Sequence, residues 1–392
     1  MALHNENGQL SPEELARYDR HIIIPEFGIE AQRKLKHARV LVVGTGGLGA
    51  PLLQYLTAAG VGHIGVLDFD RVDESNLQRQ VLFGREDVGK PKVEAAIARL
   101  GNLNHHVEFT AHDIQLTSDN ALDILKDYDI VADGTDNFPT RYLVNDACVL
   151  LDKVNVYASI FRFDGQVSVF NYKQGDAPAP NYRDLFPEPP PPGLVPSCAE
   201  GGVLGVLPGI IGSMQAAEVI KVITGVGEPL SGKLFTYDAL NFETRILNFS
   251  THSQNPLTGE NPTQTGLIDY AQFCGVSPEQ AAQEDTEVGE ITPQELKKRL
   301  ENGEDIAVID VREPHEYAIA NIDGELIPHK QVSEHTHKIP KDKPVVVHCK
   351  SGVRSAKAIR ELQNEHGYHN LLNLKGGILA WADEIEPELQ RY

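Results

Sequence analysis

Two stretches of the sequence combine residue types and spacings that are suited to chemistry. The first is a loop with glycines at four positions, Gly44, Gly46, Gly47 and Gly49. Glycines let a backbone approach a phosphate, which the N-terminus of a following helix then stabilises. Asp68 follows at a spacing of about twenty residues and is placed to bind ribose hydroxyls. These features predict a nucleotide site, and by themselves they suit NAD as well as ATP.

Polar and charged side chains downstream of Asp68 distinguish between these ligands. Four of them are expected beside the nucleotide edge of the sheet: Asn76, Arg79, Lys92 and Asp136. Arg and Lys neutralise charge that develops on a polyphosphate, and an acidic residue at the end of a strand can hold Mg²⁺. An NAD-dependent dehydrogenase needs no such set. The four residues together therefore favour phosphate chemistry with ATP and Mg²⁺. Any one of them alone would more often be an ordinary solvated surface residue.

The second stretch is a cysteine loop that begins at Cys349. An apolar run ends at His348, and the sequence Cys-Lys-Ser-Gly-Val-Arg follows and leads into a helical pattern. Backbone N–H groups of such a loop and the helix N-terminus would converge on the sulfur and stabilise a thiolate or persulfide. A dual-specificity phosphatase has a loop one residue longer, which makes room for phosphate. The shorter spacing from Cys349 to Arg354 favours a sulfur atom.

The elements that must position these residues alternate between strands and helices. Residues 38–68 give an apolar strand, the glycine turn, an apolar helix and a second strand, which is a βαβ unit. Alternation continues with elements near residues 92–100, 107–110, 119–125, 129–132 and from 139. We therefore expect an α/β fold with a doubly wound, mostly parallel Rossmann-like sheet. A proline-rich stretch at 171–197 should cross over the active site without forming a ladder, before a helix at 205–223 and strands at 233–237 and 244–249.

Composition changes again after residue 274. Residues 275–289 are acidic, rich in Gln and poor in apolar side chains, which is typical of a linker. Thr292 is a candidate helix cap, and Pro293 suits the first helical position. Strands and helices then alternate as in a small α/β domain. We predict an ATP-binding domain at 1–274, a linker at 275–289 and a second domain at 290–392.

Charge and cysteine usage restrict the class of protein. The 35 basic and 56 acidic residues give a net charge of −21, which disfavours nucleic acid and anionic membranes as partners. The N-terminus lacks a signal-like apolar run, so a cytosolic protein is expected. The four cysteines, Cys148, Cys198, Cys274 and Cys349, form no CxxC pair and no disulfide framework. Free thiols are therefore the default.

The first half resembles the ubiquitin-activating-enzyme superfamily, in the branch of the molybdopterin-synthase adenylyltransferase (MoeB) and ThiF. The resemblance rests on RYDRHIIIPEFG, GTGGLG, DFDRVDESNLQRQ, GKPKVEAA and DGTDN, and it covers residues 18–273. It implies a homodimer, with Arg20 reaching the partner's ATP site. It also implies ATP at the glycine loop, with Asp68 on the ribose, Arg79 and Lys92 on the phosphates, and Asp136 on Mg²⁺. Many relatives carry a CxxC where this chain has residues 181–184, so no structural zinc is expected.

The second half resembles rhodanese sulfurtransferases over residues 290–391, through IDVREPHEYA, the Cys349 loop and LKGGILAW. The fusion resembles MoeZ and MOCS-type enzymes. It implies adenylation of the C-terminal glycine of a ubiquitin-like sulfur carrier of the molybdenum cofactor, thiamin, cysteine or tRNA-thiolation type. The Cys349 persulfide, charged by a cysteine desulfurase or another donor, would then supply sulfur. Cys198 either joins this transfer covalently, as in related enzymes, or is a buried small residue. A rhodanese module that only docks a partner, or acts independently on thiosulfate, is the alternative.

Overall fold

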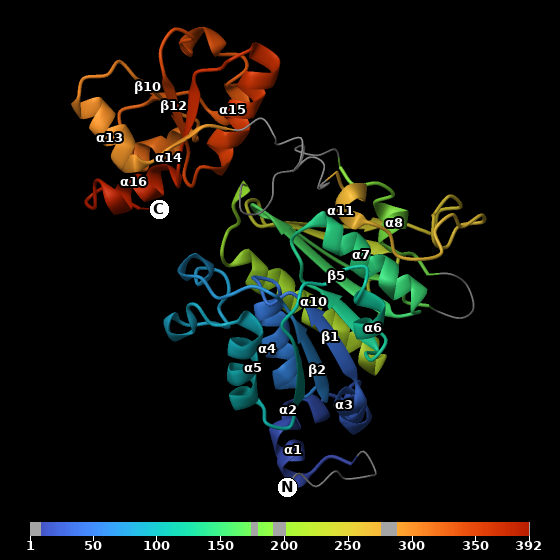
Figure 1. Ribbon diagram of the computed structural model, residues 1–392. Coiled ribbons are helices and arrows are strands. Elements are labelled where there is room, and N and C mark those ends of the chain that lie inside the picture. Colours follow the sequence, from blue (N-terminus) through green and yellow to red (C-terminus); the bar gives the residue numbers. More distant parts are fainter. Residues whose placement is uncertain (1–8, 174–178, 191–200, 276–287, 392) are drawn as a thin grey trace. The chain divides into compact units, whose positions relative to one another are not determined.

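The computed structural model describes residues 9–173, 179–190, 201–275 and 288–391. The chain divides into two compact units, at Met1–Ser277 and Pro278–Tyr392. This boundary falls inside the segment predicted as a linker. Each unit has its own sheet and its own apolar core, and each is described separately (Figure 1).

The first unit is built on an eight-stranded sheet in the order β3-β2-β1-β4-β5-β6-β7-β8. The pairings from β3 to β5 are parallel and those from β5 to β8 are antiparallel. The strands are β1 (Arg39–Val43), β2 (His63–Leu67), β3 (Glu108–His112), β4 (Ile130–Asp133), β5 (Val154–Phe161), β6 (Asp164–Phe170), β7 (Lys233–Asp238) and β8 (Glu243–Asn248). The predicted doubly wound fold is therefore confirmed, with an antiparallel extension at one edge.

Helices cover both faces of this sheet (Figure 1). Val40 and Val42 of β1 pack with one group of helices, and Leu41 and Val43 pack with the other. This alternation is the period of two that a strand imposes on its side chains. The first group is α3 (Gly28–His37), α4 (Gly49–Ala59), α5 (Lys92–Leu103) and α10 (Leu207–Thr224), and the second is α6 (Ala121–Leu125), α7 (Phe138–Leu150) and α11 (Tyr270–Phe273).

Short elements complete the first unit: α1 (Pro12–Arg17), α2 (Asp19–Ile22), η1 (Glu74–Asn76), η2 (Arg85–Asp87) and α8 (Tyr182–Leu185). α8 lies inside the proline-rich stretch, for which the sequence predicted only an irregular crossover. Asn181 caps this helix by accepting from the Arg183 N–H, and the Asp184 side chain accepts from the Asn181 N–H. These two local bonds explain a helical turn in a segment with so many prolines.

The second unit is a five-stranded, all-parallel sheet in the order β11-β10-β12-β13-β9. Thr292 caps α13 by accepting from the Glu295 N–H at 3.2 Å, and Pro293 is its first residue, as predicted. The elements are β9 (Glu290–Ile291), α13 (Pro293–Glu301), β10 (Ala307–Asp310), α14 (Pro314–Ile319), β11 (Glu325–Leu326), η3 (His329–Gln331), η4 (Thr336–Lys338), β12 (Val345–His348), α15 (Val353–His366), β13 (Leu371–Leu374) and α16 (Gly377–Glu384). The described helices include none that is both long and apolar enough to cross a membrane.

Candidate active sites

The first unit contains a cavity of about 1110 Å³ at the carboxyl ends of the parallel strands. Ligands of open α/β sheets bind at this edge. Most of the residues predicted for the nucleotide site line the cavity, namely Gly44, Gly46, Gly47, Asp68, Asn76, Arg79, Lys92 and Asp136. Gly49 and Arg20 do not line it. Arg20 lies on α2, where its side chain is 88% exposed and 3.9 Å from Asp19, so any role for it at an ATP site stays a prediction.

The backbone of the glycine loop is closely packed at two positions and open at a third. Gly44 adopts a left-handed φ of +92°, and a Cβ on Gly49 would lie 1.9 Å from the Gly44 carbonyl oxygen. Neither position therefore tolerates a side chain. A Cβ on Gly46 would meet only a Gln80 side-chain atom, at 3.9 Å, so space is open above the loop. The loop leads directly into the N-terminus of α4, which favours an anion there.

Asp68 connects this loop to the end of β2. One of its carboxylate oxygens accepts from the Thr45 N–H and from the Thr45 hydroxyl, each at 2.7 Å, and the other accepts from the Asp70 N–H at 2.9 Å. A carboxylate offers about four acceptor positions, so capacity remains for ribose hydroxyls. Asp68 thus holds the loop and faces the cavity at once.

Cationic side chains enter the cavity from the segment after β2. The Lys92 side chain is 94% buried, and its ammonium lies 2.9 Å from the carboxylate of Asp70, whose side chain is 53% exposed. Arg79 donates to the Ser75 carbonyl at 3.2 Å. A buried ammonium with a solvated counter-ion interacts strongly with a second anion in the cavity. This pair of cations is suited to a polyphosphate.

Two aspartates follow β4 and differ sharply in environment. Asp133 is buried, and burial raises the pKa of its carboxyl. One oxygen of Asp133 accepts from Thr135, so this residue shapes the turn. Asp136 is exposed and faces the cavity, next to Asn137, which caps α7 by accepting from the Thr140 N–H at 3.0 Å. Asp136 is therefore the carboxylate that is available to a cation.

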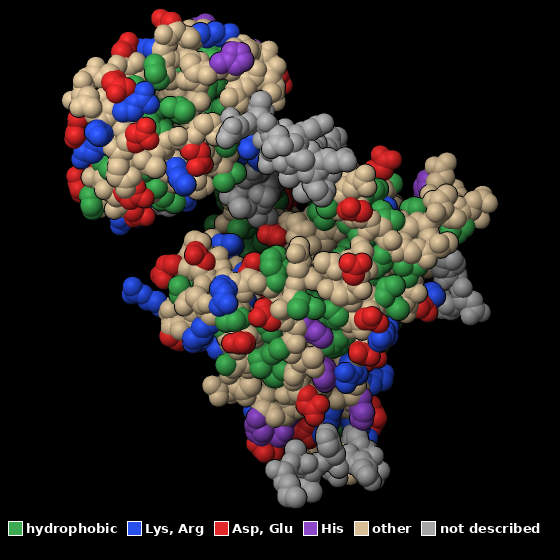
Figure 2. Space-filling model, viewed as in Figure 1, with side chains coloured by type: hydrophobic (Ala, Val, Ile, Leu, Met, Phe, Trp, Pro, Cys, Tyr) green, Lys and Arg blue, Asp and Glu red, His purple; other side chains and the backbone are tan. Residues whose placement is uncertain are grey.

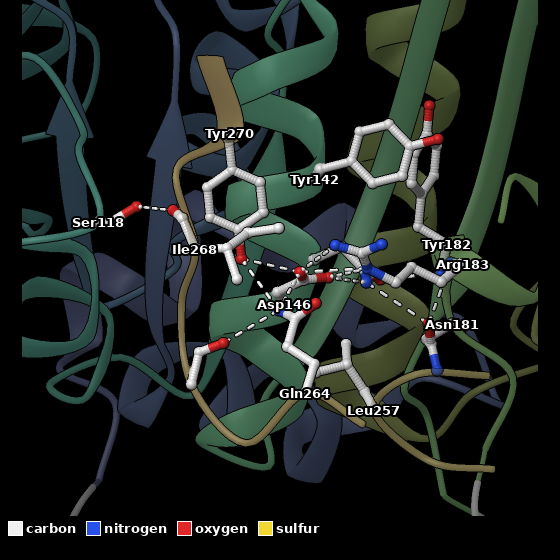
Figure 3. Close-up of polar contacts among 12 residues, drawn as sticks. Ser118, Tyr142, Asp146, Asn181, Tyr182, Arg183, Leu257, Gln264, Ile268 and Tyr270 are labelled. Carbon is white, nitrogen blue, oxygen red and sulfur yellow. Dashed lines mark hydrogen bonds and ion pairs between the residues drawn. The ribbon is translucent and has the colours of Figure 1, made fainter. Parts of the chain in front are cut away.

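One wall of the cavity was not predicted from the sequence. Residues 268–271 line it, and the Ser118 hydroxyl donates to the Ile268 carbonyl at 2.6 Å, across 150 positions in the sequence. Behind this wall lies a buried ionic cluster (Figure 3). The Tyr270 hydroxyl and the Gln264 amide both donate to one Asp146 oxygen at 2.8 Å. No local signal in the sequence could have placed this segment beside the nucleotide site.

Asp146 also forms the strongest ion pair of this cluster. Its carboxylate accepts two hydrogen bonds from Arg183 Nε, at 2.9 and 3.1 Å, and one from Nη2 at 2.7 Å. Both side chains are almost completely buried. Burial raises the pKa of Tyr270, and the neighbouring Asp146 charge raises it further. Since Arg183 belongs to α8 and Asp146 to α7, this cluster joins the crossover segment to the cavity wall.

No structural zinc was expected at residues 181–184, which contain no cysteine. Here the Asn181 amide donates to the Thr258 hydroxyl at 3.2 Å, and the Asn255 amide donates to Asp184 at 2.8 Å. Hydrogen bonds thus connect α8 to the loop at residues 252–258. The expectation that no zinc binds at this position stays a prediction.

The second unit presents the Cys349 loop between β12 and α15. The Gly352 N–H donates to Cys349 Sγ at 3.2 Å, and Ser355 Oγ lies 3.4 Å from the same sulfur. Gly352 has a left-handed φ of +94°. On the other side of the loop, the Ile378 N–H donates to the Cys349 carbonyl at 2.9 Å. The Gly352 N–H group and the N-terminus of α15 therefore favour a negative charge on the sulfur.

Two ion pairs surround this loop. Arg354 contacts both carboxylate oxygens of Glu316 at 2.6 Å. Asp310, at the end of β10, is buried with Arg312 and lies 3.7 Å from His348. Burial lowers the pKa of His348 to about 4, so this imidazole is neutral at neutral pH. Cys349 is itself 1% exposed. Cys198 lies outside the described residues, so its place relative to Cys349 stays open.

The fold and the two sites define a nucleotide-binding α/β domain joined to a sulfurtransferase-type domain. The ThiF family model matches residues 18–258, and the rhodanese-like domain model matches residues 292–384. The chain belongs to the ThiF family and carries a C-terminal rhodanese-like domain. Both resemblances inferred from the sequence are therefore confirmed.

Relatives with the same domain order match over nearly the whole chain. "Probable adenylyltransferase/sulfurtransferase MoeZ" of Mycobacterium tuberculosis is 50% identical over 386 residues, which cover 98% of this chain and 96% of that protein. "Adenylyltransferase and sulfurtransferase MOCS3" of Aedes aegypti is 41% identical and covers 98% and 90%. "Sulfur carrier protein adenylyltransferase" of Thermus thermophilus is 56% identical over 67% of this chain and 98% of its own length.

Solved structures share the fold of the first unit. The crystal structure of E. coli MccB with ATP has a TM-score of 0.55 and 24% sequence identity, and it covers 62% of this chain and 73% of that protein. The similarity therefore supports the architecture of the ThiF-type domain.

Proposed function

We propose that this enzyme adenylates the C-terminal glycine of a ubiquitin-like sulfur-carrier protein with ATP and then transfers sulfur to it from a Cys349 persulfide. The observation that carries the proposal is the cavity in which a glycine loop, a buried lysine and an exposed carboxylate meet, namely at Gly46, Lys92 and Asp136. Relatives named as adenylyltransferase and sulfurtransferase, and as sulfur-carrier adenylyltransferase, support it.

Adenylation needs positioning and charge stabilisation more than a protein nucleophile. The carrier carboxylate attacks the α-phosphorus of ATP, the bond to the β-phosphate oxygen breaks, and an acyl-adenylate and pyrophosphate result. Lys92 and Arg79 stabilise the charge that develops on the phosphates, and Asp68 orients the ribose. Asp136 would hold Mg²⁺, which neutralises phosphate charge when it is bound. The open space above Gly46 is consistent with a phosphate at that point.

Sulfur transfer then uses the second unit. The outer sulfur of the Cys349 persulfide attacks the acyl carbon and displaces AMP, which leaves an acyl disulfide between the carrier and Cys349. The Cys198 thiolate attacks Cys349 Sγ, releases the carrier thiocarboxylate and forms a Cys198–Cys349 disulfide. A cellular thiol reductant supplies the two electrons that reopen this disulfide. A cysteine desulfurase, as donor, restores the persulfide.

Further parts of the proposal concern assembly. Arg20 is exposed on α2, which suits a residue that acts on the second subunit of a homodimer. The acidic net charge suits a locally basic protein partner rather than nucleic acid or an anionic membrane, and the enzyme is proposed to act in the cytoplasm. The carrier is one with a Gly-Gly tail, serving molybdenum cofactor synthesis or another thiolation route.

ATP–pyrophosphate exchange with a panel of Gly-Gly-ending carriers tests the adenylation step. Carrier-dependent exchange should be present in the wild type and lost in Asp136→Ala. Asp129→Ala, which changes an aspartate outside the cavity, is the matched control. Exchange that is absent with every carrier would contradict the proposal.

Thiocarboxylate formation tests the role of the second unit. Cys349→Ala should keep carrier-dependent exchange and make no thiocarboxylate with a desulfurase as donor, whereas Cys274→Ala should make it normally. If Cys349→Ala makes thiocarboxylate at the full rate, the rhodanese-like domain serves as a docking module or as an independent thiosulfate sulfurtransferase.

A further inference from the structure

Three metal-ligating side chains meet on the surface of the first unit, beside α1. Glu13 lies on α1, and His105 and His106 follow the C-terminal end of α5. The Glu13 Oε1 atom is 3.4 Å from His105 Nε2 and 3.8 Å from His106 Nε2. Figure 2 shows histidine side chains gathered at this part of the surface. None of the three residues lines the nucleotide cavity.

These distances suit one shared metal ion. Zinc binds imidazole nitrogen at about 2.0–2.1 Å and carboxylate oxygen at about 2.0–2.2 Å, which puts two tetrahedral ligand atoms roughly 3.4 Å apart. The two Glu13–histidine separations are close to that value. All three donor atoms lie within 4.8 Å of one another, so a small rotation of the exposed His105 ring completes the triangle. The cluster is thus nearly in ligating geometry.

The backbone that carries these residues is held in place. The buried amide of Asn104, next to His105, donates to the Tyr18 hydroxyl and to the Thr57 carbonyl, each at 2.8 Å. Arg17, at the end of α1, also donates to the Leu103 carbonyl. These bonds fix α1 against the end of α5, so an ion would find its ligands on two elements that are already joined. Preorganised ligands bind a metal with less loss of entropy.

The His106 side chain is less exposed than those of His105 and Glu13. Its Nε2 atom is buried and has no hydrogen-bond partner among the described residues. A buried lone pair without a donor is costly, and a metal would satisfy it.

We infer that Glu13, His105 and His106 bind one divalent ion of the zinc class, with water in the remaining positions. Two imidazoles and one carboxylate are a ligand set that zinc uses in proteins. The ion would connect α1 to the C-terminal end of α5. This site is independent of the adenylation and sulfur-transfer proposals, because it shares no residue with either.

Isothermal titration calorimetry of the full chain with zinc tests the inference. The wild type should bind one ion per chain, and Glu13→Gln and His106→Asn should bind at least about tenfold more weakly, since even residues outside the ligand set contribute 10–100-fold to affinity. His37→Asn, a change of an exposed histidine on α3, should bind like the wild type.

Two further readouts separate a metal site from a structural ion pair. Zinc should raise the thermal unfolding midpoint of the wild type and of His37→Asn but not that of Glu13→Gln. X-ray absorption at the zinc edge should report nitrogen and oxygen ligands and no sulfur. Glu13 is 66% exposed on its side chain, so Glu13→Gln keeps the fold. A wild type that binds no zinc, or a Glu13→Gln chain that binds it as tightly, overturns the inference.

Discussion

Replacing Tyr270 with Phe removes a single hydroxyl from the ionic cluster behind the nucleotide cavity. That hydroxyl donates to a buried Asp146 oxygen at 2.8 Å. A hydrogen bond to a charged group contributes about 1.5–3 kcal/mol. The Gln264 amide donates to the same oxygen, so Asp146 keeps partners, and we expect a loss near the lower limit, about 1.5 kcal/mol. At about 2–4 °C per kcal/mol, the unfolding midpoint of the first unit should fall by roughly 3–6 °C.

Tyr142→Phe is the matched control for this change. Tyr142 is also buried and packs its ring against the Arg183 guanidinium, but its hydroxyl donates to a neutral group, the Phe186 carbonyl, at 3.0 Å. The expected loss is therefore smaller, about 0.5–1.5 kcal/mol. Thermal and urea unfolding of the full chain would measure both, and the transition of the second unit should not change. Equal losses in the two variants would show that the charge of Asp146 adds nothing.

The same variant should affect nucleotide binding, because Tyr270 lies in the cavity wall. We expect a higher KM for ATP with a nearly unchanged kcat, and Tyr142→Phe should keep both. The folded-state pKa of Tyr270 is raised, so its contribution to stability is complete below the unfolded-state pKa of about 10 and is lost as the pH rises above it. Tyr270→Phe should lack this alkaline loss. An unchanged KM for ATP would refute the assignment of residues 268–271 to the nucleotide site.

Three other predictions concern single titratable side chains. His348 has a pKa of about 4 in the folded protein and about 6.5 in the unfolded chain. The free energy of unfolding of the second unit should therefore fall by roughly 3 kcal/mol as the pH falls from 6.5 to 4. Urea unfolding of His348→Gln should show a weaker dependence of stability on pH. Lys92→Met should slow pyrophosphate exchange by about 10²–10³-fold, measured from initial rates. Its thermal unfolding midpoint, measured by calorimetry, should remain close to that of the wild type. Glu316→Gln removes the negative charge that faces Arg354. Because thiosulfate is a dianion, its KM in a thiosulfate–cyanide assay should fall. A KM that rises would contradict this reasoning.

The glycine loop and Asp68 could be predicted from the sequence because their constraints are local. The positive φ of Gly44 and the contact of Gly49 with the Gly44 carbonyl arise within six residues, so they leave a visible pattern. The Cys349 loop is similar, because Gly352 and the start of α15 follow within four positions. In both cases the residues that bind a ligand and those that shape the backbone are neighbours in the chain.

Other features have no such local signature. The β5–β6 hairpin went unpredicted, since its two-residue turn uses Arg162 at a φ of +54° where Gly or Asn would have signalled it. The wall at Ile268 depends on a contact with Ser118, and the Asp146–Arg183 pair joins residues 37 positions apart. Such contacts follow from how the sheet brings its loops together. The high proline content of residues 171–197 gave no indication of the short helix α8.

The depth of Cys349 affects the timing of the proposed sulfur transfer. Its side chain is 1% exposed, and Gly352 and Ser355 lie against the sulfur. The outer atom of a persulfide would extend about 2 Å further along the S–S bond, within reach of an acyl group. Release of the carrier thiocarboxylate, by contrast, needs attack on the inner sulfur, Cys349 Sγ, which is shielded. The step that frees the thiocarboxylate, rather than the step that captures the carrier, would therefore depend on access to Cys349 Sγ and would set the rate of each turnover.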